Sequence, residues 1–204
     1  MERDERHGRR SICLKGYDYT RDGAYFVTIC TQERLRIFGT IVVGDMQLNE
    51  CGQEVAHCWA WLAEQYPYVC LDEWIVMPDH THAIIVITED RRYVTGSDGT
   101  RSDGARSDGL CRGGSRTALN RTASTMGFAA QPAVGTDGSG FLPTKRKPLG
   151  RLIGAFKTVS TRRVNDLRSI PGASLWQRNY YEHVIRNEES LQAARRYIVN
   201  NSSL

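Results

Sequence analysis

Two segments near the start of the chain are dominated by β-branched and aromatic residues. They cover residues 24–32 and 36–43, and the polar pair Glu33 and Arg34 lies between them. Segments of this length and composition predict two β-strands joined by a short turn. The first part of the chain is therefore expected to begin a sheet.

A second pair of strands is predicted around Pro78 and Asp79. The flanking segments, 68–77 and 80–87, are rich in Val, Ile and aromatic residues. Two strands separated by two residues favour an antiparallel hairpin. Residues 84–87 are apolar on both faces of a strand, so we expect the second strand to lie in the middle of the sheet.

Three segments carry apolar residues at helical spacing. The first begins at Asn49 and is expected to end near Pro67, the second begins at Pro148, and the third follows a cap at Asn187 and runs to about Asn201. The apolar stripe of the first helix consists of Val55, Cys58, Trp59 and Leu62. That of the second consists of Leu149, Leu152, Ile153, Phe156, Val159, Val164 and Leu167.

One more strand is predicted over residues 175–186, between the second and third helices. The resulting order, β-β-α-β-β-(insertion)-α-β-α, predicts an α+β fold in which helices pack on an antiparallel sheet of ferredoxin-like character. Residues 1–204 are expected to form a single domain.

Residues 88–147 differ in kind from the rest of the chain. They are rich in Gly, Ser, Thr, Asp and Arg, and they repeat the pentad R-S-D-G-x. Few of them can contribute to a core, and no apolar position recurs that would let repeats stack. We therefore interpret this segment as a long disordered, low-complexity insertion.

The composition is that of a soluble globular protein, with 40% hydrophobic and 25% charged residues. The apolar runs are too short to cross a membrane, and the charged N-terminus leads into no hydrophobic signal segment, so a cytoplasmic protein is expected. The six cysteines show no C-x-x-C spacing, which favours reduced thiols over disulfides or a zinc site.

Positive charge is concentrated in one part of the chain. Residues 91–168 contain fifteen Lys and Arg against five Asp, although the net charge of the whole chain is only +4. This asymmetry favours a basic surface for a polyanion, and a solvated basic loop is the alternative.

His80 and His82 interrupt the most apolar run in the chain. Side chains at i and i+2 of a strand lie on the same face, so the two imidazoles are expected side by side at the start of the strand. Such a pair can bind one divalent metal ion, and two hydrogen-bonded structural histidines are the alternative. Because two ligands leave a metal shell incomplete, a third must come from elsewhere.

The predicted last helix offers Tyr197, with Asn201 four residues later on the same face. Taken alone, this pair indicates no particular function. A helix tyrosine is usually a packing residue, and an asparagine at this position can be a helix cap.

In combination, these motifs resemble one known family. M-P-D-H-T-H resembles the histidine–hydrophobic–histidine (HUH) segment of single-tyrosine transposases. W-Q-R-N-Y-Y-E-H-V-I-R-N-E-E-S-L followed by Y-I-V-N-N resembles the C-terminal signature of one branch, the REP-associated tyrosine transposases. G-Y-D-Y-T-R-D-G-A-Y-F-V-T-I-C-T resembles the first strand of that branch and its lead-in. The resemblance covers roughly residues 9–87 and 148–201.

The resemblance implies an HUH endonuclease palm and a metal-dependent nickase and ligase for single-stranded DNA that folds into hairpins. It implies that His80 and His82 bind Mg²⁺ or Mn²⁺ and that Asn201 completes the metal shell. Tyr197 matches the nucleophile, which forms a 5′-phosphotyrosine. Whether such a protein is a monomer or a homodimer stays open.

Three positions depart from the family pattern. Thr81 replaces the usual apolar residue between the histidines, and being β-branched it is expected to fit a strand. Asp79 replaces the commoner Asn and adds a negative charge, either as a further metal contact or as a liability. After Asn201 the family continues, whereas here three residues follow, so the last helical turn is expected to fray.

Residues expected to contact DNA are of two kinds. The candidates for phosphate contacts are Arg9, Arg10, Lys15, Lys157, Arg162 and Arg163. Trp176 and Tyr180 are candidates for stacking on unpaired bases, with packing in the sheet as the alternative.

Two other functions fit the residues. One is a catalytically inactive DNA-hairpin-binding protein derived from a transposase, which would bind DNA without metal-dependent cleavage. The other is an unrelated metal-binding fold with a structural H-x-H motif, which would lack salt-sensitive binding of single strands.

Overall fold

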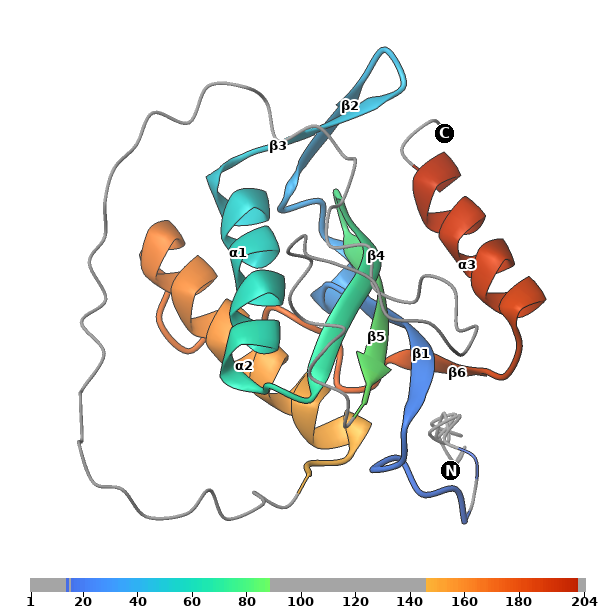
Figure 1. The fold of residues 1–204 in the computed structure, drawn as a ribbon. Helices are drawn as coiled ribbons and strands as arrows, with labels where there is room; N and C mark the ends of the chain where they lie inside the picture. The colour runs from blue at the N-terminus through green and yellow to red at the C-terminus, as the bar shows by residue number, and fades with distance from the viewer. Residues whose placement is uncertain (1–13, 15, 89–145, 202–204) are drawn as a thin grey trace, which may run out of the picture.

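A four-stranded antiparallel sheet forms the centre of the computed structural model, which describes residues 14, 16–88 and 146–201 (Figure 1). Its strands are β1 (Gly23–Cys30), β4 (Val69–Met77), β5 (His80–Ile87) and β6 (Tyr181–Ile185). They lie in the order β4-β5-β1-β6, so β5 is an inner strand, as predicted. The predicted hairpin between β4 and β5 is likewise confirmed.

Two helices cover one face of the sheet, and a third lies on the other face (Figure 1). α1 (Glu50–Gln65) and α2 (Leu149–Arg168) pack side by side on the first face, and α3 (Glu188–Asn201) covers the second. The central β-α-β-β-α-β order is that of ferredoxin-like folds. The predicted α+β architecture is therefore confirmed.

The predicted helix starts and apolar stripes are also present. Asn49 accepts a hydrogen bond from the backbone N–H of Gly52 at 3.0 Å, and Asn187 accepts one from the N–H of Ser190 at 2.8 Å. Each cap satisfies a backbone donor that the first helical turn leaves unpaired. Every residue of the two predicted stripes is buried or half-buried except Leu167, which is exposed near the end of α2.

The larger core lies between the sheet and the pair α1 and α2. Trp59 of α1 stacks on Phe156 of α2, with ring centroids 3.9 Å apart. Trp59 also donates its indole N–H to Oγ1 of Thr81 at 3.0 Å, and Thr81 donates to the carbonyl oxygen of Ile75 at 2.8 Å. Thr81 therefore faces α1 with its hydroxyl satisfied, which explains how a polar residue is accommodated between the two histidines.

A β-bulge in β4 provides the ion pair that anchors α3. The register between β4 and β5 shifts between Leu71 and Trp74, and within this stretch the side chain of Asp72 is fully buried. Arg195 of α3 donates to both carboxylate oxygens of Asp72, with its Nε 2.9 Å from Oδ1. The buried residues of α3 are Leu191, Ile198 and Asn201. Because this apolar contact is narrow, the ion pair fixes the position of α3 on the sheet.

The chain between β1 and α1 differs from the prediction. The first strand ends at Cys30, residues Gln32–Arg34 form a short 3-10 turn (η1), and β2 (Gly39–Val42) pairs with β3 (Asp45–Leu48). The predicted polar turn is present and the strand predicted over 36–43 is confirmed over Gly39–Val42, but this strand does not join the sheet of β1, and β3 was missed. β2 and β3 form a separate two-stranded ribbon.

Two features of the backbone explain why β2 pairs with β3 and not with β1. The backbone N–H groups of Ile37 and Phe38 both donate to the carbonyl oxygen of Pro78, at 2.8 and 3.1 Å, and lead the chain across the end of the sheet. Val43 and Gly44 then both adopt positive φ angles, 53° and 87°. Two such residues form the tight turn that closes a hairpin, so the strand after Gly44 pairs with β2.

The strand predicted over 175–186 is shorter in the structure and begins at Tyr181. Trp176 forms only an isolated bridge with Thr31. Its indole N–H donates to Oγ of Ser160 at 2.8 Å, and its ring packs near Phe156 in the core. Side-chain packing against α2 therefore decides the course of the chain before β6.

Three further predictions concern the insertion, the cysteines and membrane-spanning segments. The low-complexity insertion predicted over 88–147 lies almost wholly outside the described residues. Cys30, Cys51 and Cys58 are free thiols, as predicted, whereas Cys70 is disulfide-bonded, so the prediction of reduced thiols is wrong there. No helix within residues 16–88 and 146–201 has the length and apolar character needed to cross a bilayer.

Substituting Arg195 by Met leaves the buried Asp72 carboxylate without its ion pair. We expect the free energy of unfolding to fall by about 3 kcal/mol or more, because an uncompensated buried charge costs that much. Urea denaturation measures the loss. Arg196→Met, at an exposed position of the same helix, is the control and should change stability by no more than ~0.5 kcal/mol. Equal stability of the two variants would contradict the structural role of the pair.

Candidate active site

A cleft of about 830 Å³ lies between the sheet and α3. Residues from β1, β5, β6, α3 and the turn after β1 line it. Four residues of the predicted functional site line this cleft: His80, His82, Tyr197 and Asn201. The fold therefore brings together the two halves of the predicted site, from an inner strand and from the last helix.

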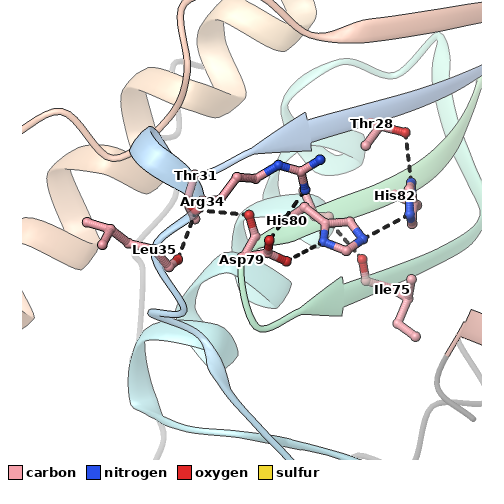
Figure 2. Close-up of polar contacts among 9 residues, drawn as sticks. Thr28, Thr31, Arg34, Leu35, Ile75, Asp79, His80 and His82 are labelled. Atoms are coloured by element: carbon pink, nitrogen blue, oxygen red, sulfur yellow. Dashed lines mark hydrogen bonds and ion pairs between the residues drawn. The ribbon is translucent and has the colours of Figure 1, made fainter. Parts of the chain in front are cut away.

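Strand pairing places the two histidines side by side on the sheet (Figure 2). His80 and His82 lie at the start of β5, where they pair with Cys30 and Thr28 of β1. Their Nε2 atoms are 3.1 Å apart. As predicted from the period of a strand, both rings lie on the same face of the sheet, opposite to the face that Thr81 occupies.

Each histidine also has its second ring nitrogen in a hydrogen bond (Figure 2). Nδ1 of His80 lies 2.6 Å from Oδ1 of Asp79, and Nδ1 of His82 lies 2.8 Å from Oγ1 of Thr28. When Nδ1 carries the proton, it donates to these oxygens and the lone pair of each Nε2 is directed at the other histidine. Metal-binding histidines are oriented in this way, by a hydrogen bond from the nitrogen that does not bind.

The environment keeps His82 neutral. Burial, with smaller contributions from the nearby His80 and Arg34, lowers the pKa of His82 to about 3, and Asp79 opposes this shift. The folded protein therefore holds His82 as neutral imidazole at neutral pH. Only this form has a lone pair for a metal ion.

The distance between the two Nε2 atoms suits an octahedral ion. Two neighbouring ligands that each lie about 2.1 Å from such an ion are roughly 3 Å apart, and the observed distance is 3.1 Å. Asn201 adds a neutral amide to the same cleft. In the described part of the chain, no three His, Cys, Asp or Glu side chains gather as a metal site. A complete shell here therefore needs other oxygen ligands, such as this amide, water or a substrate.

Tyr197 lies edge-on to His82, with ring centroids 5.2 Å apart. It also makes an edge contact with Phe26 at 5.8 Å, and Phe26 stacks on His82 at 5.4 Å. About half of Tyr197 is exposed, so its phenol can meet a ligand in the cleft. The expected fraying of the last turn is not observed, because α3 continues through Asn201, which is buried.

None of the described residues predicted to contact DNA lines this cleft. Those outside the described residues are Arg9, Arg10 and Lys15. The described ones, all on or near α2, are Lys157, Arg162, Arg163, Trp176 and Tyr180. Sequence reasoning thus identified the residues of the cleft and, separately, a set of residues on the opposite face of the sheet.

Most of this second set is engaged within the protein. Lys157 donates from Nζ to three backbone carbonyl oxygens at 2.9 to 3.2 Å, and burial lowers its pKa to about 8. Arg163 donates to Glu54 of α1 at 2.8 Å, and the ring of Tyr180 lies 5.5 Å from Nζ of Lys157. Arg162 keeps an exposed side chain beside a second cleft of about 590 Å³. Burial of Trp176 in the core fits the packing role that the sequence left open.

Sequence reasoning missed other residues of the cleft. Thr28 and Phe26 show only the alternation of an ordinary strand, and their place beside His82 depends on the pairing register of β1 with β5. Arg34 was interpreted as part of a polar turn, yet it lines the cleft. Tyr181, in the strand predicted over 175–186, lies in the same cleft as the predicted nucleophile and is 45% exposed.

Comparisons with known proteins give two similar solved structures and a relative in sequence. No family model matches the chain. Two solved structures are similar at 15% identity: a REP-associated tyrosine transposase bound to a REP hairpin, and a candidate transposase from Deinococcus radiodurans. Their TM-scores are 0.48 and 0.42; the first match covers 92% of this chain and 70% of the other, and the second covers 94% and 99%.

The relative in sequence is an uncharacterised protein of Haemophilus influenzae. The two sequences are 33% identical over 198 residues, which cover 97% of this chain and 90% of the other. The chain therefore belongs to the same protein family as this Haemophilus influenzae protein.

Proposed function

We propose that the protein is an HUH-type tyrosine transposase, which cuts and rejoins single-stranded DNA that folds into hairpins. The observation that carries this proposal is the convergence of three groups in one cleft. The Nε2 atoms of His80 and His82 lie 3.1 Å apart, and the ring of Tyr197 lies 5.2 Å from that of His82. A divalent ion beside an accessible phenol would promote attack of the phenol on a phosphodiester.

In this proposal His80 and His82 hold Mg²⁺ or Mn²⁺, and Asn201 is the third protein ligand. A bound divalent ion neutralises the charge that develops on the non-bridging phosphate oxygens. All three protein ligands are neutral, so they add no repulsion for a phosphate. The nearby carboxylate of Asp79 is engaged by Nδ1 of His80 and by Arg34.

Tyr197 is the nucleophile in this proposal. Its phenolic oxygen attacks the phosphorus and loses its proton to solvent, the P–O3′ bond breaks, and the departing 3′ oxygen takes up a proton. The products are a 5′-phosphotyrosine and a free 3′-hydroxyl. Because one phosphate diester replaces another, attack by a 3′-hydroxyl on the phosphotyrosine rejoins DNA without ATP.

Tyr197→Phe removes the attacking oxygen and keeps the ring. We expect this variant to form no detectable covalent adduct with oligonucleotides taken from inverted repeats that flank the gene, in the presence of Mn²⁺. Tyr181→Phe is the matched control, since Tyr181 lines the same cleft, and it should retain the adduct. Denaturing gel electrophoresis of labelled DNA measures both.

The opposite pattern, an adduct in Tyr197→Phe and none in Tyr181→Phe, would assign the nucleophile to β6. If the unmodified protein binds these hairpins but forms no adduct under any metal condition, it is the inactive hairpin-binding protein instead.

His82→Ala removes one of the two converging ring nitrogens. We expect the affinity of the DNA-free protein for Mn²⁺ to fall by more than the roughly 10- to 100-fold that loss of an outer hydrogen-bond partner costs. Titration calorimetry measures this affinity without relying on activity. His183→Ala changes an exposed histidine of the same cleft and serves as the control. Equal Mn²⁺ affinity in both variants would show that His82 is not a ligand.

A further inference from the structure

We propose that Arg34 binds a phosphate of the DNA strand beside the two histidines, and that the turn Gln32–Arg34 presents its guanidinium group there. The ligand is thus a phosphodiester, held next to the point of attack. This inference rests on the proposed function and adds a binding residue to it.

The position of Arg34 is the first support. It lines the cleft of His80 and Tyr197, and no other Lys or Arg of the described chain does so. Its side chain is 57% exposed, and its Nη1 lies 3.4 Å from Oδ2 of Asp79. Figure 2 shows the guanidinium group extending from its turn toward Asp79 and His80. A phosphate that reaches His80 therefore arrives next to a cation.

The backbone of the turn is the second support. Glu33 and Arg34 are consecutive residues with φ angles of 56° and 57°, in the left-handed region that non-glycine residues avoid. Such residues persist only where the surrounding structure over-determines them, and they concentrate at functional sites.

Thr31 supplies the contacts that hold this strained turn. It is completely buried, and its N–H and Oγ1 each lie 2.9 Å from the carbonyl oxygen of Asp79. Oγ1 also lies 2.9 Å from the carbonyl oxygen of Leu35, and the N–H of Arg34 donates to the carbonyl oxygen of Thr31 at 3.2 Å. These bonds tie the turn to the residue that precedes His80, so the position of Arg34 relative to the cleft is built into the backbone.

Electrostatics is the third support. An exposed ion pair at 3.4 Å is held weakly, so exchanging Asp79 for a phosphate costs Arg34 little. Guanidinium groups bind phosphate through two parallel, charge-assisted hydrogen bonds. Asp79 keeps its shorter bond to His80 at 2.6 Å, so the orientation of that histidine survives the exchange.

Neutral replacement of single phosphates tests the inference. Oligonucleotides carrying one methylphosphonate each, placed in turn around the cleavage site, are titrated against the protein and against Arg34→Gln. We expect one replacement to weaken binding by the unmodified protein about tenfold or more, as loss of a charge-assisted contact does. Arg34→Gln should bind unmodified DNA as weakly and be insensitive to that same replacement.

Arg36→Gln is the matched control, because it makes the same change at an exposed position two residues away. It should respond to every replacement as the unmodified protein does. Arg34→Gly adds a second variant, since glycine adopts positive φ without strain. We expect its melting temperature to be no lower than that of the unmodified protein, with DNA binding as weak as in Arg34→Gln.

The outcomes separate the two proposals. If Arg34→Gln binds DNA as tightly as the unmodified protein, or stays sensitive to every phosphate replacement, the role of Arg34 is overturned. Adduct formation by the unmodified protein would still support the proposed function in that case. A lower melting temperature of Arg34→Gly with unchanged DNA binding would make Arg34 a structural partner of Asp79 instead. Absence of both adduct and single-strand binding in the unmodified protein overturns the proposed function itself.

Discussion

The two-residue turn of Pro78 and Asp79 is the constraint on which the candidate site depends. The carbonyl oxygen of Pro78 accepts the N–H groups of Ile37 and Phe38, and that of Asp79 accepts both donors of Thr31. One turn therefore joins the central hairpin to the strained turn after β1 and to the base of the β2–β3 ribbon. Its carboxylate then orients the first of the two histidines. Because both carbonyl groups of the turn accept hydrogen bonds from the chain after β1, the turn fixes the start of β5, where His80 lies.

The two faces of β5 lie in different environments. The face with Thr81 packs under Trp59 of α1 and belongs to the larger core. The opposite face carries the histidines at the start of the strand and a smaller core farther along, which includes Ile84 and Val86. Since β5 has a neighbour on each side, its backbone cannot shift without breaking both pairings. The histidines therefore lie on an element that is held on both sides. Tyr197 lies on α3, which is attached to the sheet by a narrow apolar contact and by the Asp72–Arg195 ion pair.

The strand periods, the helix stripes and the caps at Asn49 and Asn187 could be predicted from the sequence because they depend on neighbouring residues. The common face of His80 and His82 follows for the same reason, since it requires only the period of a strand. The spacing of Tyr197 and Asn201 needs only the pitch of a helix. Their proximity to the histidines was expected from the resemblance to a family, and no local pattern contains it.

Tertiary structure decided everything that depends on contacts between distant segments. The register of β1 against β5 places Thr28 beside His82, and contacts with the Pro78–Asp79 turn both create the strained turn of Arg34 and start the separate ribbon. Burial against α2 takes Trp176 into the core. By itself the sequence determined the elements and the faces that their side chains occupy, because these follow from backbone periods of two and 3.6 residues. Which faces meet, and which charged groups lie beside the histidines, was decided by long-range packing and hydrogen bonding that no local spacing encodes.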